Sequence, residues 1–251
     1  MGGPREVLGK WLRGLWEELF VLLTASAVWT VIGLGPALLL FALGLAPLGF
    51  IALLAALPPM TIGVYYVTNR LAHDYVGKFS HIFEGARLYA RQAWLLAVVN
   101  VFIVAVLWAN YQFYAPSEEG PRIIGVGGAE LTIDPSSTWA VAARSILFSI
   151  ALVWIYSQLY ALPMLLEQKE PNIWFAMRNS LFLAFGSPAL TITLSVILFI
   201  LGFLVLVSLP QFLRWLPFLL ILPAMIAFLT NIAVVQRLKA LKGETKAGEE
   251  R

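Results

Sequence analysis

The sequence contains no cysteine, two histidines and few charged residues, since Asp, Glu, Lys and Arg make up 12% of its 251 residues. Without cysteine the chain has no disulfide framework, thiol nucleophile or thiolate metal site. An average soluble domain carries about twice this fraction of charge. The net charge of +3 is also too small and too scattered for a nucleic-acid footprint. These scarcities exclude an ordinary cytosolic enzyme, a disordered chain and a nucleic-acid-binding domain.

Hydrophobic residues are correspondingly abundant, at 60% of the chain, and the mean hydropathy is +0.83. A soluble domain of this length could not remove so much apolar surface from water. Residues 19–69 carry no charged side chain, which leaves room for two helices of about 20 residues that each cross a bilayer. We therefore expect an all-α, polytopic integral membrane protein with no cofactor.

The hydropathy pattern predicts a six-span helical bundle within residues 19–236. The spans are expected at 19–43, 48–69, 92–114, 139–166, 181–208 and 215–235. Gly44 and Pro47 mark the first turn, because glycine frees the backbone and proline cannot continue a helix. Of the 17 Lys and Arg residues, 14 fall on the side that holds both ends of the chain. This bias predicts a cell-membrane protein with cytoplasmic N- and C-termini.

Four segments outside these spans have amphipathic or charged character. Residues 1–18 are expected to form an amphipathic interfacial helix, and the inner loops 70–91 and 167–180 also carry apolar helical faces. Residues 237–251 are expected to be a basic, disordered cytoplasmic tail.

The outer loop, 115–138, is expected to contain a β-hairpin. Its strands are Arg122–Val126 and Ala129–Ile133, because the intervening Gly127-Gly128 can supply the positive φ angles of a two-residue turn. A phosphate loop is a poorer interpretation, since Pro135 and Ser136 follow in place of a Gly-Lys-Ser/Thr step.

The two inner loops share a short motif. Its pattern is Ile, an aromatic residue, any residue, a small residue, any residue and Arg. The first copy runs from Ile82-Phe83 to Arg87, and the second from Ile173-Trp174 to Arg178. A Leu-Pro step precedes each copy. The pattern indicates a weak parallel internal repeat, which is common in transporters but also arises by simple duplication.

Candidate chemistry within the spans rests on a handful of polar side chains. They are Thr61, Asn100, Gln158, Asn231 and Arg144. They either make hydrogen bonds between helices or line a polar pathway, and Arg144 lies near enough to a span end to snorkel outward. His73 and His81 would stand about 12 Å apart on a helix, too far to bind one metal ion. We therefore expect no metal site and no catalytic residue.

Several of these segments together resemble the YesL-like bacterial membrane proteins. The resemblance is carried by Leu57-Pro58-Pro59-Met60-Thr61-Ile62-Gly63, the amphipathic loop with Phe79 and Phe83, and the span end Asn110–Tyr114. It covers roughly residues 15–115, and its motifs are short and apolar. The long segment 33–56 departs from the family pattern by its apparent expansion. The resemblance implies a bacterial inner-membrane setting beside carbohydrate-uptake systems, with no catalytic residues to transfer.

Two functional hypotheses follow. The first is a non-enzymatic accessory or regulatory protein of carbohydrate uptake, whose partners are the lipid bilayer and components of a carbohydrate transporter. The alternative is a stand-alone small-solute transporter or channel with a polar pathway between the repeats. A membrane-embedded enzyme would need a convergent acid–base set that the sequence does not offer. Homo-oligomerisation is left open.

Overall fold

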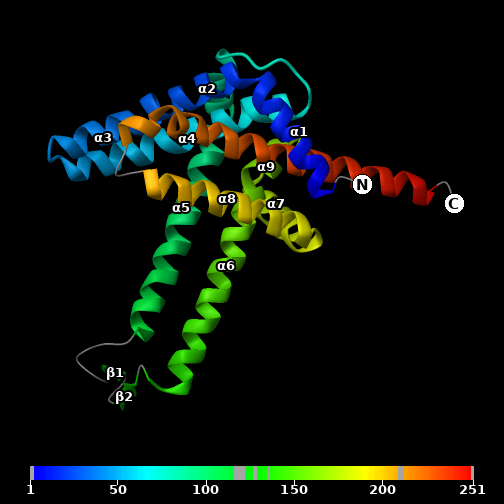
Figure 1. Ribbon diagram of the computed structural model, residues 1–251. Helices are drawn as coiled ribbons and strands as arrows, with labels where there is room; N and C mark the ends of the chain where they lie inside the picture. Colours follow the sequence, from blue (N-terminus) through cyan, green and yellow to red (C-terminus); the bar gives the residue numbers. More distant parts are fainter. Residues whose placement is uncertain (1–2, 116–121, 127–128, 135, 209–211, 250–251) are drawn as a thin grey trace. The chain divides into compact units, whose positions relative to one another are not determined.

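The computed structural model describes residues 3–115, 122–126, 129–134, 136–208 and 212–249. This part of the chain is helical apart from one two-stranded hairpin (Figure 1). The elements are α1 (Pro4–Glu17), α2 (Leu19–Val28), the π-helix η1 (Trp29–Leu34), α3 (Gly35–Ala42), α4 (Ala46–Ala72), α5 (Ser80–Tyr114), β1 (Arg122–Val126), β2 (Ala129–Ile133), α6 (Thr138–Leu166), α7 (Ile173–Gly186), α8 (Pro188–Ser208) and α9 (Phe212–Glu249). They divide into two compact units, one of residues 1–97 and 156–251 and the other of residues 98–155.

Five helical segments are long and apolar enough to cross a membrane. They are Leu19–Ala42, α4, α5, α6 and the Leu220–Gly243 part of α9. The pair α7 and α8 passes the same test as a sixth span, although it is bent by 100°. The described residues therefore contain five or six candidate spans, as expected of a multi-pass helical membrane protein.

The fifth predicted span, 181–208, is wrong as a single helix. Residues 181–186 are the end of α7, and α8 begins at Pro188 after a sharp bend. Proline lacks the N–H that would continue the helix and disfavours a helical conformation of the preceding residue. Ser187 accordingly has a ψ of 62°. α8 alone still has 21 residues, or about 31 Å of helix, which matches the hydrocarbon thickness of a bilayer.

The inner loops are shorter than predicted, and the tail is helical. α5 begins at Ser80 and runs unbroken through the predicted boundary near Gln92, because no proline interrupts it there. In the second loop, the Asn172 side chain caps α7 by accepting hydrogen bonds from the N–H groups of Trp174 and Phe175. The expectation of a disordered 237–251 is also wrong for the described residues, since α9 continues to Glu249. That segment is rich in Lys, Ala, Leu and Glu, which favour helix.

Two predicted local structures are confirmed. The chain turns at Gly44, whose φ is 75°, between α3 and α4. The N–H of Gly44 bonds to the carbonyl of Phe41 and the N–H of Leu45 to that of Leu40, which is a Schellman cap. In the hairpin, Arg122 pairs with Ile133 and Val126 with Ala129. The expected turn residues, Gly127 and Gly128, lie outside the described part of the chain.

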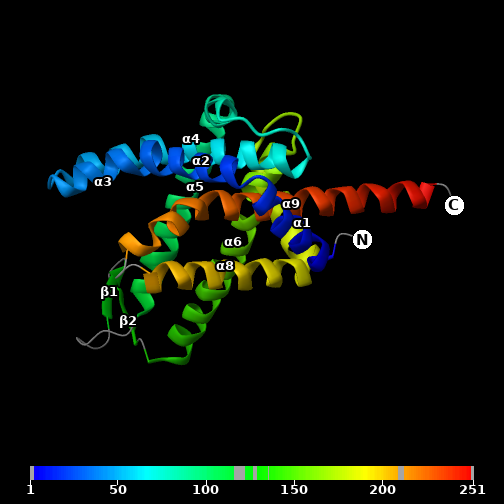
Figure 2. The same cartoon turned by 45° about the horizontal axis from the view of Figure 1, so that its top comes forward.

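Helix α9 lies at the centre of the first unit. It packs against α1, α2, α4 and α8, and Figure 2 shows α8 running alongside it. Ala224, Ala227 and Ala233 are fully buried, because small side chains let neighbouring helices approach closely in a membrane. The hydroxyl of Ser26 joins α2 to α9 by donating to the carbonyl of Ile221 and accepting from the N–H of Ala224.

Proline in α4 creates a further contact between helices. Pro59 has no N–H to donate to the carbonyl of Ala55, one turn earlier. The indole N–H of Trp94 on α5 donates to that carbonyl at 3.2 Å. A neighbouring helix therefore satisfies a backbone group that the proline leaves unpaired, as membrane helices with internal prolines require.

Candidate functional site

The polar residues singled out within the spans serve mainly as helix contacts. The indole N–H of Trp29 donates to the Thr61 hydroxyl at 2.9 Å, and Thr61 in turn donates to the carbonyl of Leu57. The indole of Trp154 on α6 donates to the Asn100 side-chain oxygen on α5 at 3.1 Å, within the second unit. These contacts favour the interpretation of hydrogen bonds between helices.

The contacts of Gln158 and Arg144 do not distinguish between a helix contact and a polar pathway. Gln158 donates to Ser157, its neighbour on α6. Arg144 lies in the second turn of the same helix with a partly exposed side chain. Neither residue belongs to the lining of the charged pocket that is described below.

Asn231 is fully buried and ties α9 to α4. Its amide nitrogen donates to the backbone carbonyl of Tyr65 at 3.0 Å and to the hydroxyl of Thr68 at 2.8 Å. Thr68 is also fully buried and donates to the carbonyl of Val64. The amide is thus satisfied by protein groups on the neighbouring helix, which fixes the register between the two helices.

A second group of polar side chains lies next to Asn231, at the end of α4. The amide nitrogen of Asn69 donates to the carboxylate of Glu167 at 2.7 Å and lies 3.5 Å from the Asn231 oxygen. The His73 Nδ1 lies 3.0 Å from the Asn69 carbonyl, and its Nε2 lies 3.5 Å from the Glu167 carboxylate. A carbonyl only accepts hydrogen bonds, so the proton of a neutral His73 belongs on Nδ1. Glu167 was not among the site residues predicted from the sequence, although it directly follows a predicted span.

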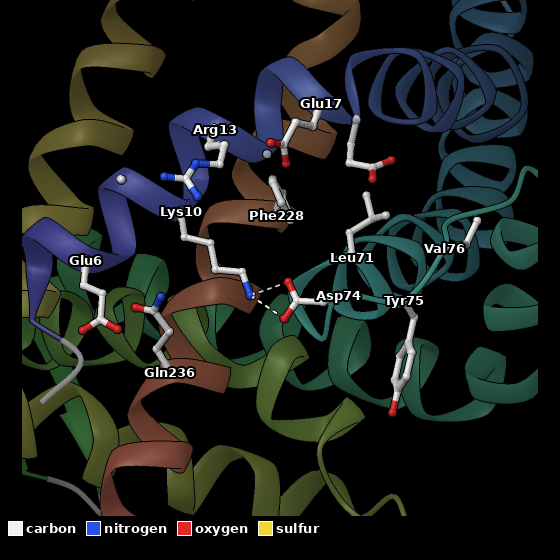
Figure 3. A pocket seen from close by; sticks show the side chains of 13 residues that line it. Glu6, Lys10, Arg13, Glu17, Leu71, Asp74, Tyr75, Val76, Phe228 and Gln236 are labelled. Atoms are coloured by element: carbon white, nitrogen blue, oxygen red, sulfur yellow. Dashed lines mark hydrogen bonds and ion pairs between the residues drawn. The ribbon is translucent and has the colours of Figure 1, made fainter.

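A charged pocket lies beside α1 in the described part of the chain. It has a volume of about 700 Å³, and its side chains come from α1, α4, α9 and the segment after α4 (Figure 3). Four carboxylates and two cations line it: Glu6, Glu17, Glu18, Asp74, Lys10 and Arg13. The side-chain oxygen of Gln236, also in the lining, is buried and has no hydrogen-bond partner within the described part of the chain.

Lys10 joins α1 to the end of α4. Its ammonium lies 2.8 Å from an Asp74 carboxylate oxygen and donates to the carbonyl of Ala72 at 3.0 Å. Figure 3 shows this pair across the pocket. A cation at the last carbonyls of a helix also interacts favourably with the helix dipole.

Asp74 occupies a left-handed backbone conformation with a φ of 64°. It is the turn residue of a second Schellman cap, in which the N–H of Tyr75 bonds to the carbonyl of Arg70. Aspartate tolerates this conformation better than most residues other than glycine. The sharp turn presents its carboxylate to Lys10.

Buried contacts hold α1 against α9. The side chains of Val7 and Trp11 are buried, and the Trp11 indole donates to the carbonyl of Met225 at 3.1 Å. Gly14 allows the ring of Phe228 to approach the α1 backbone, where a Cβ would come within 2.6 Å of the ring. The predicted amphipathic helix therefore packs partly on protein, whereas Leu12 and Trp16 remain 60% and 83% exposed.

The charged face of α1 can be recognised in the sequence, although its residues were not among the predicted site residues. Glu6, Lys10, Arg13 and Glu17 recur at spacings of four, three and four residues, which places them on one side of a helix. The contribution of Asp74 could not be found this way, because it depends on a turn more than 60 residues later.

The repeated loop motif occupies equivalent environments in its two copies. Ile82 is buried and Ile173 partly buried, the following aromatics Phe83 and Trp174 are exposed, and Arg87 and Arg178 are both exposed. The small residues Gly85 and Ala176 are buried in both copies. The Arg178 guanidinium lies over the Phe175 ring at 5.5 Å. The two copies of the motif thus have similar burial at the start of α5 and of α7, while the internal repeat stays a prediction.

No family model matches the chain, and neither does any curated protein or solved structure. The resemblance to YesL-like proteins consequently stays a prediction. Within the described residues no group of three or more His, Asp or Glu side chains is placed to hold a metal ion.

Acidification should weaken the attachment of α1 through Asp74. The hydrogen bond from Lys10 lowers the pKa of the Asp74 carboxyl below its ordinary value, against a smaller effect of burial. The stabilisation is fully present above the ordinary aspartate pKa of about 3.9, and it is lost as the pH falls through the lower pKa of the folded state. Because Asp74 is 69% exposed, we expect less than about 1 kcal/mol.

The measurement is the Tm of the purified protein and of the Asp74→Asn variant between pH 7 and pH 3. The difference between the two proteins should shrink at the acid end, while Glu170→Gln, at an exposed loop position, should show no such trend. A difference between wild type and Asp74→Asn that is independent of pH would contradict the assignment.

Proposed function

We propose that this chain is a non-catalytic membrane protein that assists carbohydrate uptake by binding a basic segment of a transporter component in the pocket beside α1. The observation that carries the proposal is the placement of charge. All six charged lining residues lie outside the candidate spans, whereas Thr61, Asn100 and Asn231 within the spans are engaged in helix contacts.

The chemistry of the pocket supports a basic partner. Four carboxylates outnumber two cations there, and Lys10 is already engaged by Asp74 and the carbonyl of Ala72. The buried oxygen of Gln236 adds an acceptor to which no described residue donates. Such a lining attracts Lys or Arg side chains and steers their approach.

The cellular setting of the proposal rests on sequence. The excess of Lys and Arg on the side that holds both termini favours a cytoplasmic location of the pocket. The carbohydrate context rests on the resemblance of residues 15–115 to YesL-like proteins.

The stand-alone transporter or channel receives less support. Its candidate pathway residues include Thr61, Asn100 and Asn231, each of which bonds to a tryptophan or to the backbone of another helix. None of the three lines the charged pocket. Hydrogen bonds of this kind stabilise helix packing in membranes by about 0.6–2 kcal/mol each and need no transport role.

The test is site-specific photo-crosslinking in the native host during growth on a polysaccharide. A photoreactive amino acid replaces Val76, which lines the pocket and is 73% exposed, and a control replaces Leu38, which is 57% exposed on α3. We expect a crosslink from position 76, but not from position 38, to a carbohydrate transporter component that mass spectrometry identifies.

Charge reversal sharpens the experiment. Glu17→Lys in the pocket should reduce the crosslink several-fold, while Glu170→Lys, in the exposed loop after α6, should leave it unchanged. Equal crosslinking from positions 76 and 38, together with solute uptake by the purified protein alone in proteoliposomes, would overturn the proposal in favour of the transporter.

A further inference from the structure

The bend between α7 and α8 forms a separate pocket, far along the sequence from α1. α7 ends at Gly186, Ser187 makes the turn, and α8 begins at Pro188 at an angle of 100° (Figure 1). The long apolar helix α8 therefore starts directly after this turn.

The elbow pocket has a volume of about 320 Å³ and is lined from α6, α7 and α9 as well as the turn. Among the described residues, its polar lining consists of Asn179, Ser187 and Arg237, without a carboxylate. Apolar residues complete the wall, among them Leu183, Leu238 and Leu241. One cation, neutral donors and an apolar surface thus meet in a single cavity.

Ser187 gives an independent indication of a ligand. Its hydroxyl is buried and has no hydrogen-bond partner among the described residues. Its own carbonyl accepts bonds from the N–H and the hydroxyl of Thr191, so the local backbone is satisfied while the side chain is not. A buried hydroxyl without a partner is costly, and a ligand oxygen in this pocket would remove that cost.

We propose that the elbow pocket binds the phosphate of an anionic lipid. Arg237 and the Ser187 hydroxyl form a donor set suited to phosphate oxygens, and the leucine wall suits an acyl chain. The start of an apolar helix is also where lipid headgroups lie in a bilayer. This site is independent of the function proposed for the pocket beside α1.

The test uses native mass spectrometry to measure how tightly different lipids bind to the delipidated full-length protein in detergent. Phosphatidylglycerol should bind at least about tenfold more tightly than phosphatidylcholine. This ratio of affinities corresponds to a difference of about 1.4 kcal/mol in binding free energy. Arg237→Gln should remove most of this preference, and Ser187→Ala should weaken phosphatidylglycerol binding several-fold. Arg178→Gln is the matched control, since it neutralises an exposed arginine of α7 outside the pocket.

Competition with inorganic phosphate distinguishes a lipid from a soluble anion. We expect phosphate to displace phosphatidylglycerol only at millimolar concentrations, and Arg237→Lys to restore part of the lipid preference. Equal loss of binding in Arg237→Gln and Arg178→Gln would overturn the site, as would no preference for phosphatidylglycerol in the wild-type protein. Phosphate that binds as tightly as the lipid would overturn the assignment to a lipid.

Discussion

Gly63→Ala is expected to lower the free energy of unfolding by about 1–3 kcal/mol, the usual cost of forcing extra atoms into a packed core. A Cβ at Gly63 on α4 would clash with the carbonyl oxygen of Ile82 and would lie 3.2 Å from its carbonyl carbon. Backbone atoms cannot rotate away as a side-chain end can, so α4 and the start of α5 would have to separate.

The measurement is the thermal unfolding of purified protein in detergent, compared with Gly202→Ala. Gly202 lies in α8, where a Cβ would meet nothing within 4 Å, and alanine favours helix over glycine by about 1 kcal/mol. The control should therefore keep or raise the Tm, while Gly63→Ala lowers it by several degrees. Equal shifts in the two variants would contradict the close crossing of α4 and α5.

Asn231→Ala is expected to be comparably destabilising, by about 1–3 kcal/mol. The substitution removes two hydrogen bonds to α4, to the Tyr65 carbonyl and the Thr68 hydroxyl. It also leaves a cavity at a position that is 0% exposed. Loss of buried packing and loss of hydrogen bonds both contribute to the cost.

Asn110→Ala is the matched control for this change. Its side chain is exposed and donates to the carbonyl of Val106 on its own helix, so the change should fall within about 0.5 kcal/mol. If Asn231 instead lined a solute pathway, Asn231→Ala would alter permeation in proteoliposomes while leaving the Tm unchanged. That result would contradict the role of Asn231 as a helix contact.

Local sequence signals located several elements correctly. The glycine at position 44 located the first turn because its φ of 75° is strained for other residues. The two five-residue strands around Gly127-Gly128 could be aligned because a two-residue turn sets their register. The amphipathic helix at the N-terminus followed from its apolar spacing.

The boundaries that failed depend on longer-range or backbone effects. The bend at Ser187 was missed because residues 181–208 carry no charged side chain, and hydropathy does not reveal a change of helix direction. The start of α5 at Ser80 was missed because the amphipathic residues before position 92 and the apolar residues after it differ in composition. They were assigned to a loop and to a span, whereas they form one continuous helix. The helical end of α9 was missed because its charge suggested a solvated coil.

Composition and local pattern were sufficient for the membrane class, the approximate positions of the apolar helices, the hairpin and the first turn. These features depend on transfer free energy and on backbone preferences, which act over a few residues. The two pockets and the roles of Asn231, Glu167 and Asp74 emerged only from the packed structure. Asn231 bonds to Thr68 and Lys10 to Asp74 across 163 and 64 residues of sequence. Such pairs are chosen by which helices lie against one another, and that choice is the collective outcome of burial and close packing over the whole chain.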